Sequence, residues 1–181
     1  MTQRDTKTKI GKRKTVFTGA LYTVSQARIV LLSGRTGILE TISRHPTVDI
    51  VAIHDDDKIL LNCEYRPKYK KRVWRLPGGT VEKGETWRAA AERELQEETG
   101  FKAKRLTLFH TVHMGQTIDW PRRAYLGEGL IPSKLPNDDE EDIRIEFLTL
   151  KEAMRLIERG EIRHDFTEYL IWKLFLKKKL K

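Results

Sequence analysis

The chain has 181 residues, which is the length of one domain and leaves little room for a second. Hydrophobic residues make up 39% and charged residues 34%, as in ordinary globular proteins, and no apolar run reaches the ~18–20 residues of a membrane span. Lysine and arginine exceed aspartate and glutamate by nine, so we expect phosphate-bearing partners, either nucleotides or nucleic acid. The single cysteine, Cys63, excludes an internal disulfide. Together with a start that lacks the apolar core of a signal peptide, it favours the cytoplasm.

The excess positive charge is concentrated in three places. Basic residues of the leader 1–14 and of the stretch 177–181 are interpreted as solvated tails. The third cluster, residues 66–75, is internal and has two readings. It either binds a phosphate-bearing ligand or forms a strand edge whose charge discourages aggregation.

Hydrophobic patterning predicts a series of short strands followed by a helix. Strands are expected at residues 15–24, 27–33, 36–43, 48–54, 58–63 and 73–76. Tight connections are expected at Ser25-Gln26 and at the acidic turn 55–57. The helix covers 86–98, because apolar residues recur there at helical spacing and Gly100 stands where a helix stop belongs.

The second half of the chain continues with strands and ends on helices. Strands are expected at 105–112, 123–131 and 143–150, and helices at 151–159 and 166–178. Two loops, 115–121 and 132–142, lie between the later strands. The pattern predicts an α+β fold with one domain over residues 15–181, in which helices flank a mixed sheet.

Three carboxylates at the end of the central helix are the strongest functional signal. Glu94, Glu97 and Glu98 fall within about 100° of one another around the helix. Such like-charge pairs repel by a few tenths of a kcal/mol each. The helix dipole disfavours negative charge there by a further ~0.3–1 kcal/mol per group. Mg²⁺ removes both penalties, since it takes carboxylates together with substrate phosphates, whereas the plain alternative is a solvated acidic face.

Residues around these glutamates complete a recognisable spacing. Gly78 and Gly79 free the backbone to turn and to approach an ion or phosphate, and Arg93 can orient the carboxylates. The segment matches Gly-x5-Glu-x7-Arg-Glu-apolar-x-Glu-Glu-x-Gly-apolar, the motif of the Nudix hydrolases, from Gly79 through Phe101. The chain therefore resembles that family.

This resemblance implies an α/β/α sandwich and metal-dependent hydrolysis of a nucleoside diphosphate linked to another moiety. Mg²⁺, with Mn²⁺ as the alternative, would be held by Glu94 and Glu98, with Glu97 close by and the Gly78 carbonyl as a further ligand. Glu85 and Arg93 would support that shell. Metal ions at such a site neutralise phosphate charge and help to deprotonate water.

Outside the motif the chain resembles the branch of ADP-ribose pyrophosphatases and nucleoside diphosphate sugar hydrolases. The similar stretches are His45-Pro46, then Glu64-Tyr65-Arg66-Pro67, and Glu140-Glu141-Asp142-Ile143. The resemblance implies a homodimer built by the N-terminal antiparallel strands 15–43, with active sites shared between subunits. It also implies that Arg66 binds the pyrophosphate and that Glu141 activates water, with Asp139 and Glu140 as alternatives.

Three features depart from that branch. Arg75 stands where Glu usually precedes Leu-Pro, and Gly78 stands where Ala usually precedes the motif glycine. The proline that usually follows the motif is displaced, since Gly115 occupies its neighbourhood and Pro121 comes later. The basic run 66–75 is heavier than a small nucleotide sugar needs. Trp120, in the loop 115–121, has two open readings, stacking on a base or packing.

The leading hypothesis is hydrolysis of ADP-ribose or a related nucleoside diphosphate sugar into a nucleoside monophosphate and a sugar phosphate. The alternatives are removal of pyrophosphate from RNA 5′ ends or dinucleoside polyphosphates, which the charge favours, and a non-catalytic sensor of nucleotide sugars. The expected partners are therefore a small nucleotide substrate and a second copy of the chain, with no membrane and with nucleic acid not favoured.

Overall fold

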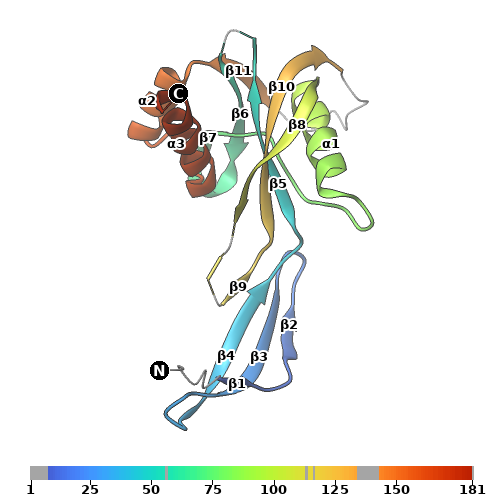
Figure 1. Ribbon diagram of the computed structural model, residues 1–181, viewed down its shortest axis with the longest axis vertical. Coiled ribbons are helices and arrows are strands. Elements are labelled where there is room, and N and C mark those ends of the chain that lie inside the picture. The colour runs from blue at the N-terminus through green and yellow to red at the C-terminus, as the bar shows by residue number, and fades with distance from the viewer. Residues whose placement is uncertain (1–7, 56, 113, 116, 134–142, 181) are drawn as a thin grey trace. The chain divides into compact units, whose positions relative to one another are not determined.

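A computed structural model describes residues 8–55, 57–112, 114–115, 117–133 and 143–180 (Figure 1). The chain divides into two compact units, which are treated separately here. Unit 1 comprises Met1–Pro46 and Val112–Pro121, and unit 2 comprises Thr47–Thr111 and Arg122–Lys181. Within the described ranges, every helix is too short or too polar to cross a lipid bilayer. The predicted division into a leader and one domain over 15–181 stays a prediction.

Unit 1 is a five-stranded sheet with the order β1-β3-β4-β9, in which β2 also pairs with β3. Its strands are β1 (Lys9–Ile10), β2 (Lys14–Thr18), β3 (Thr23–Val30), β4 (Thr36–Ser43) and β9 (Ile118–Asp119). β9 runs parallel to β4, and the other pairs are antiparallel. The strand predicted at 36–43 is confirmed, whereas β1 lies in the predicted leader and β9 in the predicted loop 115–121.

The predicted connection at Ser25-Gln26 is wrong, because both residues lie inside β3. The turn falls earlier, where the Gly19 amide donates to the Tyr22 carbonyl at 2.8 Å. Polar residues are tolerated within β3 because this sheet is partly exposed, and the Gln26 amide bonds Glu40 of β4 at 2.7 Å. Gly19 is a stronger signal of the turn than the polar pair Ser25-Gln26, because glycine adopts turn conformations readily.

Unit 2 is a six-stranded sheet with the order β11-β6-β5-β10-β8, in which β7 also pairs with β6. Its strands are β5 (Thr47–Ile53), β6 (Ile59–Arg66), β7 (Lys71–Arg75), β8 (Phe101–Val112), β10 (Arg122–Pro132) and β11 (Arg144–Leu148). β5 and β10 are parallel, while β6 is antiparallel to its neighbours. The predicted mixed sheet is confirmed.

Three α-helices cover this sheet, α1 (Trp87–Thr99), α2 (Leu150–Glu158) and α3 (Asp165–Lys179), and a short helix η1 (Pro67–Tyr69) follows β6. Figure 1 shows α1 on one face and α2 and α3 on the other, which confirms the α+β sandwich. The sequence predicted the helix bounds to within one residue. β8 begins four residues earlier than predicted, because Gly100 reverses the chain at φ 72° and the strand follows at once.

The core of unit 2 fixes where α1 lies. Ala90, Ala91 and Leu95 are fully buried and pack against Ile50 of β5 and Leu60 of β6. Burying a leucine side chain contributes ~1.5–3 kcal/mol. These contacts orient the helix so that Glu94 and Glu98, outside its buried side, reach the loop that joins β7 to α1.

Replacing Leu95 by alanine should lower the free energy of unfolding by about 2–5 kcal/mol, because it deletes a fully buried side chain and leaves a cavity. Urea denaturation measures the change. Leu108→Ala is the matched control, since Leu108 on β8 is 55% exposed and its loss should cost about 0.5 kcal/mol or less. Equal losses in both variants would show that this core does not hold α1.

Candidate functional site

The loop between β7 and α1 is tied along the edge of β5. The Ile50 amide donates to the Pro77 carbonyl at 2.8 Å, and the Val48 amide donates to the Gly79 carbonyl at 2.9 Å. Gly78 lies between these bonds with φ 154°, and a Cβ there would overlap the Val48 carbonyl oxygen. Only glycine fits this close approach, so the backbone of Gly78 is held in one orientation.

Helix α1 delivers two carboxylates to this loop. Its start is capped by the Thr86 hydroxyl, which accepts from the Ala89 amide at 3.1 Å. Gly100 ends it in the left-handed conformation. The next glycine of the loop, Gly79, is needed for space, because a Cβ there would overlap the Glu94 carboxylate. The two glycines thus let carboxylates of α1 lie directly against the loop backbone.

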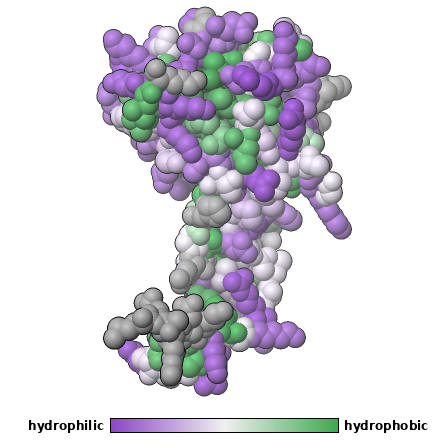
Figure 2. Space-filling view, in the orientation of Figure 1, coloured by the Kyte–Doolittle hydropathy of each residue, from purple (hydrophilic) through white to green (hydrophobic). Residues whose placement is uncertain are grey.

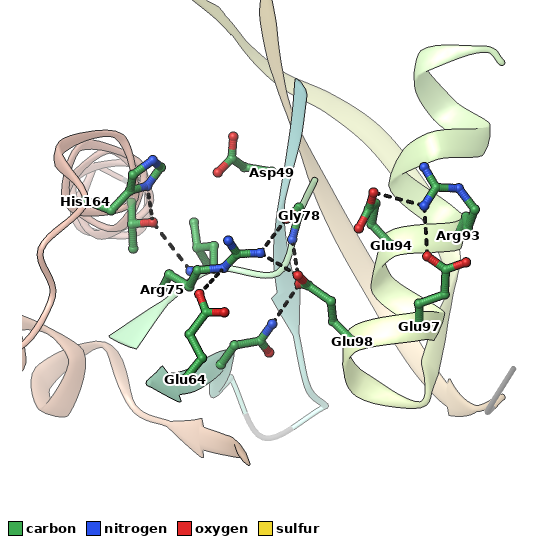
Figure 3. Close-up of polar contacts among 12 residues, drawn as sticks. Asp49, Glu64, Arg75, Gly78, Arg93, Glu94, Glu97, Glu98 and His164 are labelled. Atoms are coloured by element: carbon green, nitrogen blue, oxygen red, sulfur yellow. Dashed lines mark hydrogen bonds and ion pairs between the residues drawn. The ribbon is translucent and has the colours of Figure 1, made fainter. Parts of the chain in front are cut away.

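Glu98 is the most enclosed of these carboxylates. Its Oε2 accepts from the Asn62 side-chain amide at 2.7 Å and from the Gly78 amide at 2.8 Å, and its Oε1 accepts from Arg75 Nη2 (Figure 3). Burial raises the pKa of Glu98 to about 7, although Arg75 and the Gly78 amide favour the charged form. Glu94 and Glu64 add repulsion.

Arg93 holds the other carboxylates of the motif. Its Nε donates to Glu85 Oε1 at 3.0 Å, and its Nη1 donates to Glu94 at 2.9 Å and to Glu97 at 2.8 Å. The hydrogen bond from Arg93 lowers the pKa of Glu85, whereas burial raises the pKa of Glu94. Glu97 points at Arg93 (Figure 3), and its side chain is 39% exposed.

A chain of ion pairs continues from Glu98 to Arg66, the predicted pyrophosphate ligand. Arg75 Nε lies 3.1 Å from Glu64 Oε1, which also accepts from Arg66 Nη2. The sequence analysis assigned no role here to Asn62, Glu64 and Arg75. One signal was present: Asn62 and Glu64 lie two apart directly after the apolar run Ile59–Leu61, so both project from the same face of β6. We call Glu64, Glu85, Glu94, Glu97 and Glu98 the carboxylate cluster.

Four other predicted site residues do not belong to the described part of unit 2. Trp120 belongs to unit 1. There the Arg44 guanidinium lies over its ring, 4.2 Å from the ring centroid. The three candidates for the water-activating base, Asp139, Glu140 and Glu141, lie outside the described residues. The catalytic, substrate-binding and metal-binding roles assigned from the sequence stay predictions.

The donors at the loop suit a hard divalent cation. Among the residues that the structure describes, no three His, Cys, Asp or Glu side chains converge closely enough to bind a metal by themselves. The oxygens that do meet the loop are the carboxylates of Glu94 and Glu98, together with the Gly78 carbonyl, which accepts from Arg75 Nη2. Carboxylates with a main-chain carbonyl are ligands that Mg²⁺ and Mn²⁺ accept. The residues present therefore fit such an ion.

A second polar network supports the start of the loop from the α3 side. Arg122 pairs with the buried Asp49 at 3.0 Å, and its Nη2 lies 3.3 Å from His164 Nε2. Because the guanidinium can only donate, Nε2 accepts, and Nδ1 carries the proton toward the Thr167 hydroxyl at 2.9 Å. That hydroxyl accepts from the Leu76 amide at 3.4 Å. Burial, with Arg122 and Arg75 nearby, lowers the pKa of His164 despite Asp49.

Comparisons with known proteins agree with this arrangement. A family model described as the NUDIX domain matches residues 43–170. The chain is 29% identical over 171 residues to an ADP-ribose pyrophosphatase of Bacillus subtilis (strain 168), covering 93% of this chain and 92% of that protein. It is 31% identical over 176 residues to a methanol dehydrogenase activator of Bacillus methanolicus, covering 94% of each. A solved structure of an ADP compounds hydrolase superposes with a TM-score of 0.82 at 25% identity, covering 98% of both chains.

The neutral state of His164 predicts a pH dependence of stability. Its folded pKa lies below the ordinary 6.5, so the unfolded chain binds more protons and stability is lost as the pH falls below that value. Between pH 7.5 and 5, the free energy of unfolding should therefore fall more in the wild type than in His164→Gln. Urea denaturation at several pH values measures both slopes. Parallel slopes would show that this histidine does not contribute.

Proposed function

The chain belongs to the Nudix family of hydrolases, and on this premise we propose that it cleaves the pyrophosphate bond of ADP-ribose or a related nucleoside diphosphate sugar. The products would be a nucleoside monophosphate and a sugar phosphate. The observation that carries the proposal is the meeting of Glu94, Glu98 and the Gly78 carbonyl at one glycine loop. Of the three proteins reported above that match nearly the whole chain, the names of two, an ADP-ribose pyrophosphatase and an ADP compounds hydrolase, support this substrate class.

Nudix enzymes generally use divalent metal ions, and we propose Mg²⁺ here, with Mn²⁺ as the alternative. Glu94, Glu98 and the Gly78 carbonyl would hold the ion. When bound, it would neutralise phosphate charge and favour deprotonation of the attacking water. Arg93 keeps Glu94 in place through its bond at 2.9 Å, and it anchors itself on Glu85 and on the Thr80 carbonyl. Glu97, also held by Arg93, is proposed to act beside the ion.

The substrate is proposed to meet Arg66 and the glycine loop. The Arg66 side chain is 42% exposed and pairs with Glu64, which also pairs with Arg75, and Arg75 in turn pairs with Glu98. A guanidinium so placed can bind a diphosphate with its free edge. One of Asp139, Glu140 and Glu141 is proposed as the base, and Trp120 as a stacking partner for the nucleotide base. The cytoplasmic location likewise stays a prediction.

The basic run 66–75 favours this small substrate over RNA. Its three arginines contact acceptors of the chain itself: Arg66 bonds Glu64, Arg75 bonds Glu98, and Arg72 donates to the Cys63 carbonyl at 3.3 Å. Phosphate-backbone recognition depends on cations that face solvent. Three of the six cations of this run therefore already have partners within unit 2.

Incubating the purified protein with Mg²⁺ and a panel of nucleoside diphosphate sugars tests the proposal. We expect turnover of ADP-ribose or a close relative, and a fall in kcat of about 100-fold or more in Glu98→Gln, which removes a ligand charge. Glu92→Gln is the matched control, because Glu92 lies on the opposite side of α1 from Glu94 and should retain activity. No turnover of any panel member by the wild type would refute the assignment.

We also propose that the chain forms a homodimer through unit 1. Among its described residues, Ala27 is the one buried hydrophobic residue, so this sheet has almost no core of its own. Its exposed hydrophobic residues include Ile10, Phe17, Leu21, Leu32, Ile38 and Ile42. Figure 2 shows hydrophobic side chains at the surface of this unit. A sheet with an uncovered apolar face is marginal by itself, and a second copy would cover it.

The double substitution Ile38→Lys and Ile42→Lys should convert a dimer into a monomer. Both residues project from the exposed face of β4, at 62% and 42% exposure, so lysines there would be buried in the contact. We expect the dissociation constant to rise about 100-fold, which corresponds to ~2.7 kcal/mol. Light scattering after size-exclusion chromatography measures the mass. Leu176→Lys on α3, where the residue is 52% exposed, should leave the dimer intact. A monomeric wild type would rule out this assembly.

A further inference from the structure

Arg75 brings a positive charge to the oxygens proposed to hold the metal. Its Nη2 donates both to the Gly78 carbonyl and to Glu98 Oε1 (Figure 3). These are two of the three proposed ligand groups. The guanidinium also forms an ion pair with Glu64, whose Oε1 lies 3.1 Å from Nε without accepting a hydrogen bond from it, and the Arg75 side chain is 22% exposed.

We propose that Arg75 acts as an internal counter-ion of the metal site. In the free protein its Nη2 occupies the Glu98 carboxylate and the Gly78 carbonyl, and it would withdraw when a divalent ion took those oxygens. The inference rests on the proposed function, because it requires the metal to use Glu98 and Gly78.

Charge makes this exchange necessary. A guanidinium nitrogen and a divalent cation on the same two oxygens would repel each other strongly at a site shielded from water. Metal binding would therefore have to offset the free-energy cost of breaking both hydrogen bonds from Arg75 Nη2, one to the Glu98 carboxylate and one to the Gly78 carbonyl. Glu64 lowers that cost, because it already pairs with Arg75 Nε and keeps the displaced guanidinium next to a carboxylate.

The arrangement differs from a merely structural ion pair in its consequence for metal affinity. Removing a structural pair would disorder Glu98 and weaken metal binding. Removing a competing cation would strengthen it. Arg72 provides the matched comparison, since it lies on the same strand and donates to the Cys63 carbonyl at 3.3 Å instead of to Glu98.

Titration of the full-length protein with Mn²⁺, followed by electron paramagnetic resonance without substrate, tests the proposal. We expect Arg75→Gln to bind Mn²⁺ about tenfold more tightly than the wild type, and Arg72→Gln to stay within about twofold of it. Equal or weaker binding by Arg75→Gln would overturn the role of Arg75. If neither the wild type nor Arg75→Gln bound Mn²⁺, the metal site itself would be refuted, and this inference with it.

A measurement on the wild type keeps the test valid if Arg75→Gln fails to fold. The Nε–H signal of Arg75 in a ¹⁵N-labelled sample, assigned by its loss in Arg75→Lys, should shift during titration with diamagnetic Mg²⁺. The shift should saturate with the same Mg²⁺ dependence as the backbone amide of Gly78. An Arg75 signal that stays in place while the Gly78 amide responds would show that the guanidinium does not move.

Discussion

The burial of one carboxylate, that of Glu98, is the constraint on which the site depends. A charged group removed from water is costly unless hydrogen bonds and an opposite charge replace its hydration. The chain supplies these from three separate elements: Asn62 on β6, the amide of Gly78 in the loop and Arg75 on β7. Each donor can reach Glu98 only if the sheet, the loop and α1 keep their relative positions. The position of the Glu98 carboxylate therefore depends on the packing of unit 2, and so does the chemistry proposed for it.

Stability and function make opposing demands on α1. Its apolar side gains free energy by burying Leu95 and two alanines, whereas its end gathers glutamates where the helix dipole disfavours them. Arg93 offsets this by bonding Glu85, Glu94 and Glu97 at once. Because the helix is capped at Thr86 and Gly100, its register is fixed, and the cost of crowding the carboxylates does not unwind it.

Local signals in the sequence were sufficient to predict the helices and the family. The helix bounds followed from Thr86, Gly100 and the periodicity between them, and the family followed from the spacing of one motif. Prediction failed where structure depends on distant residues. Asn62 and Arg75 contact Glu98 across 36 and 23 residues, so the local pattern that places Asn62 and Glu64 on one face of β6 did not indicate their partner. Ser25 and Gln26 resembled a turn because polarity alone does not distinguish a turn from a half-exposed strand. The three candidates proposed for the base, residues 139–141, lie outside the described residues, so the structure does not test them.

The charge balance of the carboxylate cluster bears on how many metal ions the free protein can hold. Among the described residues, its five carboxylates are paired with three guanidinium groups, those of Arg66, Arg75 and Arg93. With Glu98 ionised, two negative charges remain, which equals the charge of one divalent ion. Further ions would need negative charge from elsewhere, and a diphosphate supplies it. Under the proposed function, the arrangement would therefore favour one ion in the free protein and additional ions only together with the substrate.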